Sequence, residues 1–127
     1  MIALVEQAAE VQRFLAERGW RSCIIGGLAV VRWGEPRFTQ DVDVSLFTGF
    51  GAEAEFARAL LERFDTRISD PVDFAVANRV MLLRGVGGVP IDIALSGFQF
   101  EEDVINRATD FEYIPGVVLK TVSAEDL

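Results

Sequence analysis

Two aspartates one residue apart, Asp41 and Asp43, lie in the apolar stretch DVDVSL. In a β-strand, residues i and i+2 point to the same face, so the two carboxylates converge while Val42 and Val44 point the other way, toward a core. Like charges this close repel unless a cation lies between them. Mg²⁺ prefers such hard oxygen ligands and keeps waters that substrate phosphates can replace. The pair is compatible with a divalent-cation site, although an isolated Asp-x-Asp is more often a solvent-facing part of a strand.

A third carboxylate, Asp92, lies in a second alternating stretch, VPIDIAL, in which its two isoleucine neighbours are expected on the opposite face. A Gly-rich turn at residues 85–88 predicts that the flanking strands form a hairpin. This hairpin can bring Asp92 beside the first two aspartates. Three acids can hold two metal ions about 3.5–4 Å apart, as in phosphoryl and nucleotidyl transfer. Taken alone, Asp92 also fits an ordinary polar position on an alternating strand.

Two glycines, Gly26 and Gly27, follow a predicted strand and precede a predicted short helix. Glycines at such a point let backbone N–H groups approach a phosphate closely, and the helix dipole favours negative charge there. The stretch is not a P-loop, because no GKS or GKT follows, and it is not the GxGxxG dinucleotide fingerprint. A tight turn is the alternative explanation of the pair.

Composition excludes several kinds of chemistry. The 127 residues include no histidine, which excludes Ser-His-Asp and Cys-His triads and His-based general bases. The single cysteine, Cys23, lies in an apolar run and is expected to be a buried, inert thiol, and a disulfide framework is excluded. The net charge of -8 argues against nucleic-acid binding through a basic face, whereas it is compatible with a site for divalent cations.

The length suggests one domain. Ser123 and Asp126 have the spacing of a helix start, yet the sequence stops at Leu127. We therefore expect residues 1–127 to be one domain that is truncated at its C-terminus, with a frayed tail as the alternative. No stretch approaches the roughly 18–20 apolar residues of a membrane span, and the N-terminus lacks the basic region of a secretory signal. A cytoplasmic location without a membrane partner is the default expectation.

Apolar periodicity and turn residues predict an alternation of helices and strands. This order predicts an α/β (α+β) domain with a mixed central sheet flanked by helices, in which the hairpin is antiparallel. Residues 73–77 carry no clear signal. Helices are expected at about residues 2–18, 28–33, 53–64 and 100–108, and strands at about 21–25, 42–46, 66–68, 79–84, 89–95 and 117–119.

In combination, these motifs resemble the nucleotidyltransferase superfamily of the DNA polymerase β type. The resemblance rests on Gly-Gly, on Asp-x-Asp beginning fourteen residues after Gly27, and on a single acid in a later strand. The nearest likeness is the minimal bacterial branch of AbiEii-toxin-like and related nucleotidyltransferases, in which the pattern GGLAV…G.PR.T.DVDV is found almost as it stands here. The likeness extends through PIDIAL, FQFEEDVINRA and VSAEDL, and covers residues from about 16 to 127.

The resemblance implies a polymerase β-like fold and a Mg²⁺-dependent enzyme. Such an enzyme moves an NMP from an NTP such as ATP to a hydroxyl of RNA, protein or a small molecule and releases pyrophosphate. It implies that Asp41 and Asp43 bind two Mg²⁺ ions, and that Asp92 binds the catalytic ion and helps to activate the acceptor hydroxyl. It further implies that Gly26 and Gly27 hold the triphosphate.

Arg37 and Thr39 match the PR.T element of the family pattern. The resemblance implies that Arg37 pairs with phosphate or braces the loop, with a surface salt bridge as an equal alternative. Many superfamily members have Ser directly after the glycines, whereas Leu28 stands here, so only backbone contacts remain at that point. The family continues into a helical part with Lys and Arg residues, which we expect to carry nucleotide choice and acceptor binding.

The toxin-like branch also implies a toxin of a toxin–antitoxin pair, with an antitoxin protein as a partner. Two alternatives stay open. One is a non-catalytic nucleotide-binding or antitoxin-like interaction module of the same fold, which the absent serine favours. The other is a plain α/β interaction domain, which requires that the three acids lie far apart.

Overall fold

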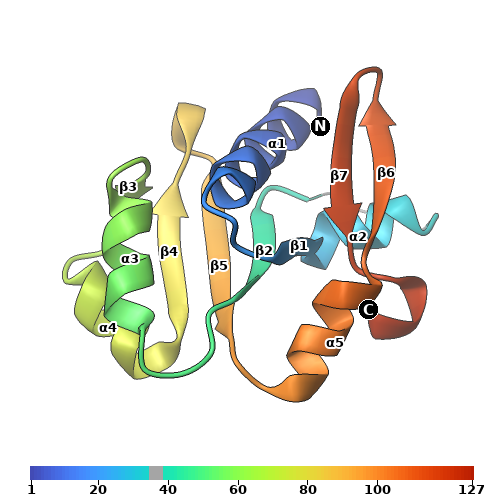
Figure 1. Cartoon of the computed structure of the whole chain (residues 1–127). Helices are drawn as coiled ribbons and strands as arrows, with labels where there is room; N and C mark the ends of the chain where they lie inside the picture. Colours follow the sequence, from blue (N-terminus) through green and yellow to red (C-terminus); the bar gives the residue numbers. More distant parts are fainter. Residues whose placement is uncertain (35–38) are drawn as a thin grey trace.

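In the computed structural model, which describes residues 1–34 and 39–127, one seven-stranded sheet runs through the protein (Figure 1). Its strands are β1 (Ser22–Ile25), β2 (Val42–Phe47), β3 (Asp65–Thr66), β4 (Val80–Arg84), β5 (Pro90–Ser96), β6 (Thr109–Ile114) and β7 (Val117–Thr121). The helices are α1 (Ile2–Glu17), α2 (Gly26–Arg32), α3 (Glu53–Leu61), α4 (Pro71–Asn78) and α5 (Gln99–Arg107), with 3-10 turns at Val86–Gly88 and Ala124–Asp126.

The strand order is β3-β4-β5-β2-β1-β7-β6. β2 is parallel to β5 and β1 is parallel to β7, whereas the other neighbouring strands are antiparallel. The sheet is therefore mixed and flanked by helices, and the predicted α/β class with an antiparallel β4–β5 hairpin is confirmed.

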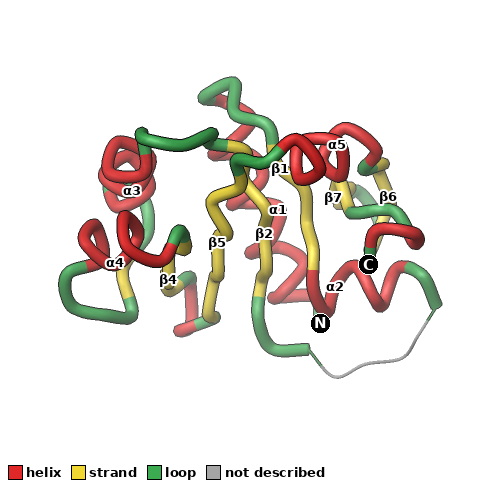
Figure 2. The backbone as a smooth tube through the Cα atoms, turned by 90° about the horizontal axis from the view of Figure 1, so that it is seen from below, coloured by secondary structure: helices red, strands yellow, loops and turns green. Residues whose placement is uncertain are grey.

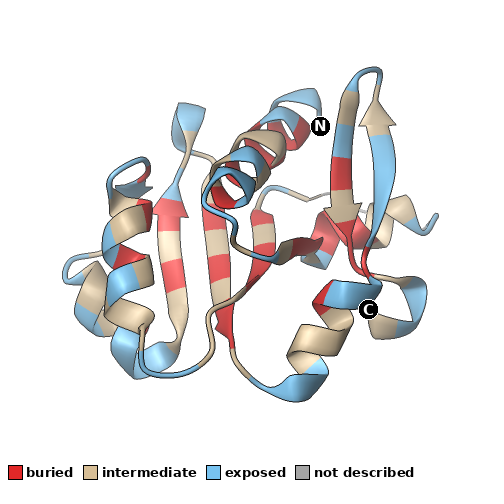
Figure 3. Cartoon of the chain, in the orientation of Figure 1, coloured by how far each residue is buried: buried red, intermediate tan, exposed pale blue. Residues whose placement is uncertain are grey.

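The main hydrophobic core lies on one face of this sheet, where α1, α3 and α4 pack. Burial follows the predicted alternation around the acids: Val42 and Val44 are fully buried, whereas Asp43 between them is half-buried. Figure 3 shows buried and less buried segments alternating along β5. Ile91 and Ile93 are buried in the same way on either side of the half-buried acid of β5. The apolar neighbours of the acids thus anchor both strands to the core, so the acids lie on the opposite face.

A smaller core lies on that opposite face and joins β1 to α2 and α5. Cys23 belongs to it and is 2% exposed. Burial raises the pKa of its thiol to about 11. Because the thiolate is the reactive form, the prediction of a buried, inert cysteine is confirmed.

The face that carries the acids is turned toward the viewer in Figure 2, where β2 and β5 lie in front of α1. Val44 and Ile93 share the main core with α1, and side chains alternate along each strand. Asp43 and Asp92 therefore point away from α1. The sheet separates the acids from the helix that covers its other side.

Three elements of the structure differ from the prediction or were not predicted. α2 begins at Gly26 rather than near residue 28, so the two glycines form its first turn. α4 occupies residues for which the sequence carried no clear signal, because only Ala75 of this helix is buried and no apolar face marks it. Pro71 is compatible with the helix because proline is tolerated in the first turn. β6 was not predicted, because it is an edge strand with no buried residue to mark an apolar face.

Among the residues that the structure describes, no helix combines the length and the apolar character needed to cross a bilayer.

Candidate active site

Three carboxylates converge on one face of the sheet. Asp41 directly precedes β2, Asp43 is the second residue of β2, and Asp92 is the third residue of β5. The parallel pairing of the two strands places Asp43 directly beside Asp92. One oxygen from each carboxylate lies within 4.8 Å of the other two. The predicted convergence is confirmed, and the hypothesis that required dispersed acids is wrong.

The three acids, here called the acidic triad (Asp41, Asp43 and Asp92), create an unfavourable concentration of negative charge. Burial, followed by the charges of Asp92 and then Asp41, raises the pKa of the Asp43 carboxyl to about 6, although Arg67 opposes this shift. A cation between the carboxylates would offset the repulsion between their negative charges. Hard carboxylate oxygens at these separations fit a divalent ion such as Mg²⁺.

Among the residues that the structure describes, one basic side chain, Arg67, contacts the acidic triad. Its Nη2 donates a hydrogen bond to Asp92 Oδ1 at 2.6 Å, and its Nη1 donates to the carbonyl oxygen of Leu83 at 2.8 Å. The side chain is one-quarter exposed, so solvent screens this ion pair only in part. Sequence reasoning missed Arg67, because nothing in its local sequence marks it. Its position depends on the pairing of β3 with β4 and of β4 with β5.

Gly26 lies against Asp43 where β1 ends and α2 begins. It has a positive φ of +69°, and a Cβ atom placed on it would lie 2.3 Å from Asp43 Oδ2. Any side chain here would collide with the carboxylate and would also strain the backbone. The antiparallel pairing of Ile25 with Asp43 brings the two segments together. Glycine at this position is therefore required by the acidic triad itself.

Gly27 makes a similar close approach to Thr39. A Cβ atom on Gly27 would lie 2.4 Å from Thr39 Oγ1. The structure thus brings Gly26 against Asp43 and Gly27 against Thr39. Arg37 lies outside the described residues. The catalytic, phosphate-binding and metal-binding roles of all these residues stay predictions.

A cavity of about 400 Å³ borders the acidic triad through Gly26. Ser45, two residues after Asp43 and therefore on the same face of β2, also lines it. Its hydroxyl forms a hydrogen bond of 2.6 Å with the Ser96 hydroxyl of β5. Phe100 and Val104 contribute apolar lining from α5 and its first turn. Gly26 therefore lies against Asp43 and also lines a partly apolar cavity.

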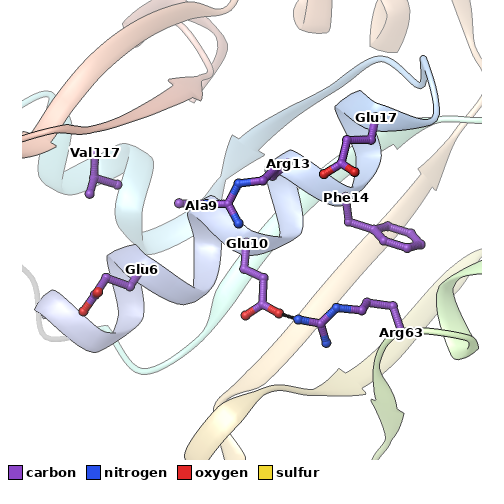
Figure 4. Close-up of a pocket in the computed structure, with 8 residues that line it drawn as sticks. All are labelled: Glu6, Ala9, Glu10, Arg13, Phe14, Glu17, Arg63 and Val117. Carbon is purple, nitrogen blue, oxygen red and sulfur yellow. Dashed lines mark ion pairs between the residues drawn. The ribbon is translucent and has the colours of Figure 1, made fainter.

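A second cavity, of about 550 Å³, lies along α1 and contains none of the acidic triad (Figure 4). Arg13 and Glu17 of α1 line it, together with Arg63. Glu10 and Arg63 point toward each other and form an ion pair. Since α1 packs on the face opposite the acids, this cavity has no part in their chemistry.

Comparison with known proteins supports the fold. No family model matches the sequence, and no curated protein matches it. The structure is similar to the crystal structure of an antigenic nucleotidyltransferase-like protein from Paracoccidioides brasiliensis, with a TM-score of 0.58 and 19% sequence identity. The match covers 94% of this chain and 60% of that chain. At this identity the likeness concerns the fold alone, which is that of a nucleotidyltransferase-like protein.

The raised pKa of Asp43 predicts a pH-dependent stability in the absence of divalent cations. The folded state binds this proton more tightly than the unfolded state, because the pKa rises from 3.8 to about 6 on folding. The free energy of unfolding should therefore fall as the pH rises from about 4 to about 6 and stay low above that range. Asp43→Asn removes this penalty, so the variant should melt at a higher temperature than the wild type at pH 8.

Thermal unfolding in a chelator from pH 4 to pH 8 measures this effect. Asp110→Asn is the matched control, because Asp110 is exposed on the edge strand β6. We expect the advantage of Asp43→Asn to be small at pH 4 and to grow toward pH 6, with no such trend for Asp110→Asn. Parallel curves for Asp43→Asn and the wild type would contradict a raised pKa at Asp43.

Proposed function

We propose that this chain is the core of a Mg²⁺-dependent nucleotidyltransferase that moves an NMP from an NTP to a hydroxyl of RNA, protein or a small molecule. The observation that carries the proposal is the convergence of Asp41, Asp43 and Asp92, with oxygens within 4.8 Å of one another. The nucleotidyltransferase-like fold supports it. Hard carboxylate ligands and a need for charge compensation at Asp43 are both what a divalent-cation site requires.

In this proposal the three acids have different roles. Asp41 and Asp43 would hold two Mg²⁺ ions, and Asp92 would be a further ligand of the catalytic one. When bound, such a pair of ions stabilises charge on the attacking and leaving oxygens of an in-line displacement. Asp92 also receives the proton of the acceptor hydroxyl. The hydroxyl oxygen forms a bond to the α-phosphorus, the bond from that phosphorus to the β-phosphate oxygen breaks, and pyrophosphate leaves.

The glycine pair has a supporting role in the same proposal. Backbone N–H groups of the first turn of a helix have no partner within the helix, and α2 begins at Gly26. The absence of side chains at Gly26 and Gly27 leaves this backbone open to close approach by a triphosphate. Thr39 would hold the segment beside Gly27 in place. Arg37 keeps its proposed part in pairing with phosphate.

A non-catalytic nucleotide-binding or antitoxin-like interaction module is the second candidate. One observation favours it: Leu28, directly after the glycine pair, is 1% exposed and belongs to the main core. No hydroxyl is therefore offered to phosphate from this position. The toxin role, and the antitoxin partner that it implies, rest on the sequence resemblance alone and stay predictions.

Calorimetry and product analysis separate the two candidates. The chain is titrated with ATP, CTP, GTP and UTP in the presence of Mg²⁺, and label from the α-phosphate is followed into added RNA and protein. The enzyme proposal predicts Mg²⁺-dependent binding of at least one nucleotide, together with labelled acceptor and pyrophosphate in equal amounts. Binding without either product would favour the interaction module. The absence of binding to all four nucleotides would contradict the enzyme proposal and the nucleotide-binding form of the module, and would leave only an antitoxin-like interaction.

A further inference from the structure

We propose that Arg67 is a positioning residue that holds Asp92 in the orientation needed to bind a divalent cation. This inference rests on the proposed function of the acidic triad. The sequence gives no sign of such a role, since Arg67 lies 25 positions before Asp92 and belongs to none of the motifs.

Arg67 is held both at its main chain and at its guanidinium. The backbone N–H of Arg67 donates to the carbonyl oxygen of Leu82 at 3.0 Å, which anchors its main chain to β4. Nη1 donates to the carbonyl oxygen of Leu83 at 2.8 Å. The register of β4 and β5 pairs Leu82 with Asp92, so Arg67 is anchored directly beside the acid. Since the five N–H donors of arginine form a rigid planar fork, fixing Nη1 also fixes the direction of Nη2.

Nη2 uses this fixed direction to contact one oxygen of Asp92. The 2.6 Å bond to Oδ1 is a charge-assisted contact in a one-quarter exposed environment. This hydrogen bond uses one of the two lone pairs of Oδ1, so Oδ2 is the oxygen more open to a cation. Arg67 thus favours a monodentate ligand of fixed orientation. A carboxylate without this partner would be free to rotate about its χ2 bond.

Charge and geometry predict opposite signs for the effect of Arg67 on cation affinity. A positive guanidinium near the acidic triad repels a cation, so its charge alone weakens binding. A partner that orients a ligand strengthens binding, and losing such a partner typically costs about 10- to 100-fold in metal affinity or activity. If Arg67 acts only through charge, its removal should tighten binding. If it acts through position, its removal should weaken binding.

Mn²⁺ alone is the probe, with binding to the full chain followed by electron paramagnetic resonance. Arg67→Gln removes the positive charge, whereas Arg67→Lys keeps the charge but lacks the planar set of N–H donors of the guanidinium. Arg84→Gln is the matched control, because Arg84 also donates to a carbonyl oxygen in the β3–β4 pair, that of Thr66, but is exposed and has no contact with the acids. Thermal unfolding of each variant identifies any loss of folding, and Arg67→Lys keeps the test valid if Arg67→Gln fails to fold.

We expect both Arg67 variants to bind Mn²⁺ roughly 10- to 100-fold more weakly than the wild type, and Arg84→Gln to bind it as the wild type does. Tighter binding by Arg67→Gln with unchanged binding by Arg67→Lys would overturn the positioning role in favour of charge alone. Unchanged binding in both variants would also overturn it. Asp92→Asn distinguishes a failure of the proposed cation site from a failure of the proposed role of Arg67. If it leaves Mn²⁺ binding intact, the proposed cation site itself fails, whereas a loss in Asp92→Asn without a loss in the Arg67 variants refutes only the role of Arg67.

Discussion

Asp43→Asn is expected to lower the rate of nucleotidyl transfer by at least about 100-fold. Loss of an outer partner of a metal ligand already costs about 10- to 100-fold, and this substitution removes one of the proposed ligands itself. Asp43 lies beside Asp92 in the β2–β5 register and contacts Gly26, so no other described carboxylate can replace it at that point. The neutral amide keeps the shape of the side chain and relieves the charge repulsion. Activity should therefore fall without a loss of folding.

The measurement is the rate of labelled NMP incorporation at saturating Mg²⁺ and NTP, with thermal unfolding recorded for the same samples. Asp110→Asn, on the edge strand β6, is the control and should retain the rate of the wild type. A variant at position 43 that melts at or above the wild-type temperature at pH 8 and has lost transfer would fit the account. Retention of transfer within a few-fold would show that Asp43 is not a ligand of the reacting centre.

Gly26→Ala should have the second largest effect. We expect it to lower the rate of nucleotidyl transfer by about 100-fold, because displacing a catalytic group by 1 Å can cost that much. The added methyl would lie 2.3 Å from Asp43 Oδ2, so either the carboxylate or the start of α2 must move. The positive φ of +69° adds backbone strain, at about 1–2 kcal/mol. The substitution therefore lowers both stability and the order of the acidic triad.

Gly19→Ala is the control that adds backbone strain at a positive φ without a steric clash. Gly19 follows α1 with a similar φ of +73°, and no heavy atom lies within 4 Å of the position its Cβ would take. We expect the two variants to lose comparable stability from strain, while only Gly26→Ala loses transfer and Mn²⁺ affinity. Equal losses of activity in both would mean that Gly26 matters through stability alone.

The acidic triad could be predicted from the sequence because its geometry follows from strand alternation. The valines around Asp43 and the isoleucines around Asp92 fix which face each acid occupies. The Gly-rich turn at residues 85–88 fixes the β4–β5 hairpin. The parallel pairing of β2 with β5, which places Asp43 beside Asp92, was not itself predicted, because it depends on contacts between segments far apart in the sequence. The mixed sheet and most of its elements could be predicted in the same way.

The parts that were missed lack a local signal. β6 is an edge strand without buried residues, and α4 buries only Ala75, so neither shows a clear apolar face. Arg67 reaches Asp92 through two successive strand pairings, which no short stretch of sequence specifies. The early start of α2 reflects the close approach of Gly26 to Asp43, a tertiary contact. That residues 1–127 are one truncated domain stays a prediction.

The central claim is that the acidic triad binds divalent cations for nucleotidyl transfer, and anomalous diffraction tests it most directly. Crystals of the chain are grown with Mn²⁺ and a non-hydrolysable NTP, and data are collected at the manganese absorption edge. The account predicts two anomalous peaks about 3.5–4 Å apart. Both peaks should contact Asp41 and Asp43, and one of them Asp92. Peaks elsewhere, with none in contact with these carboxylates, would contradict the account.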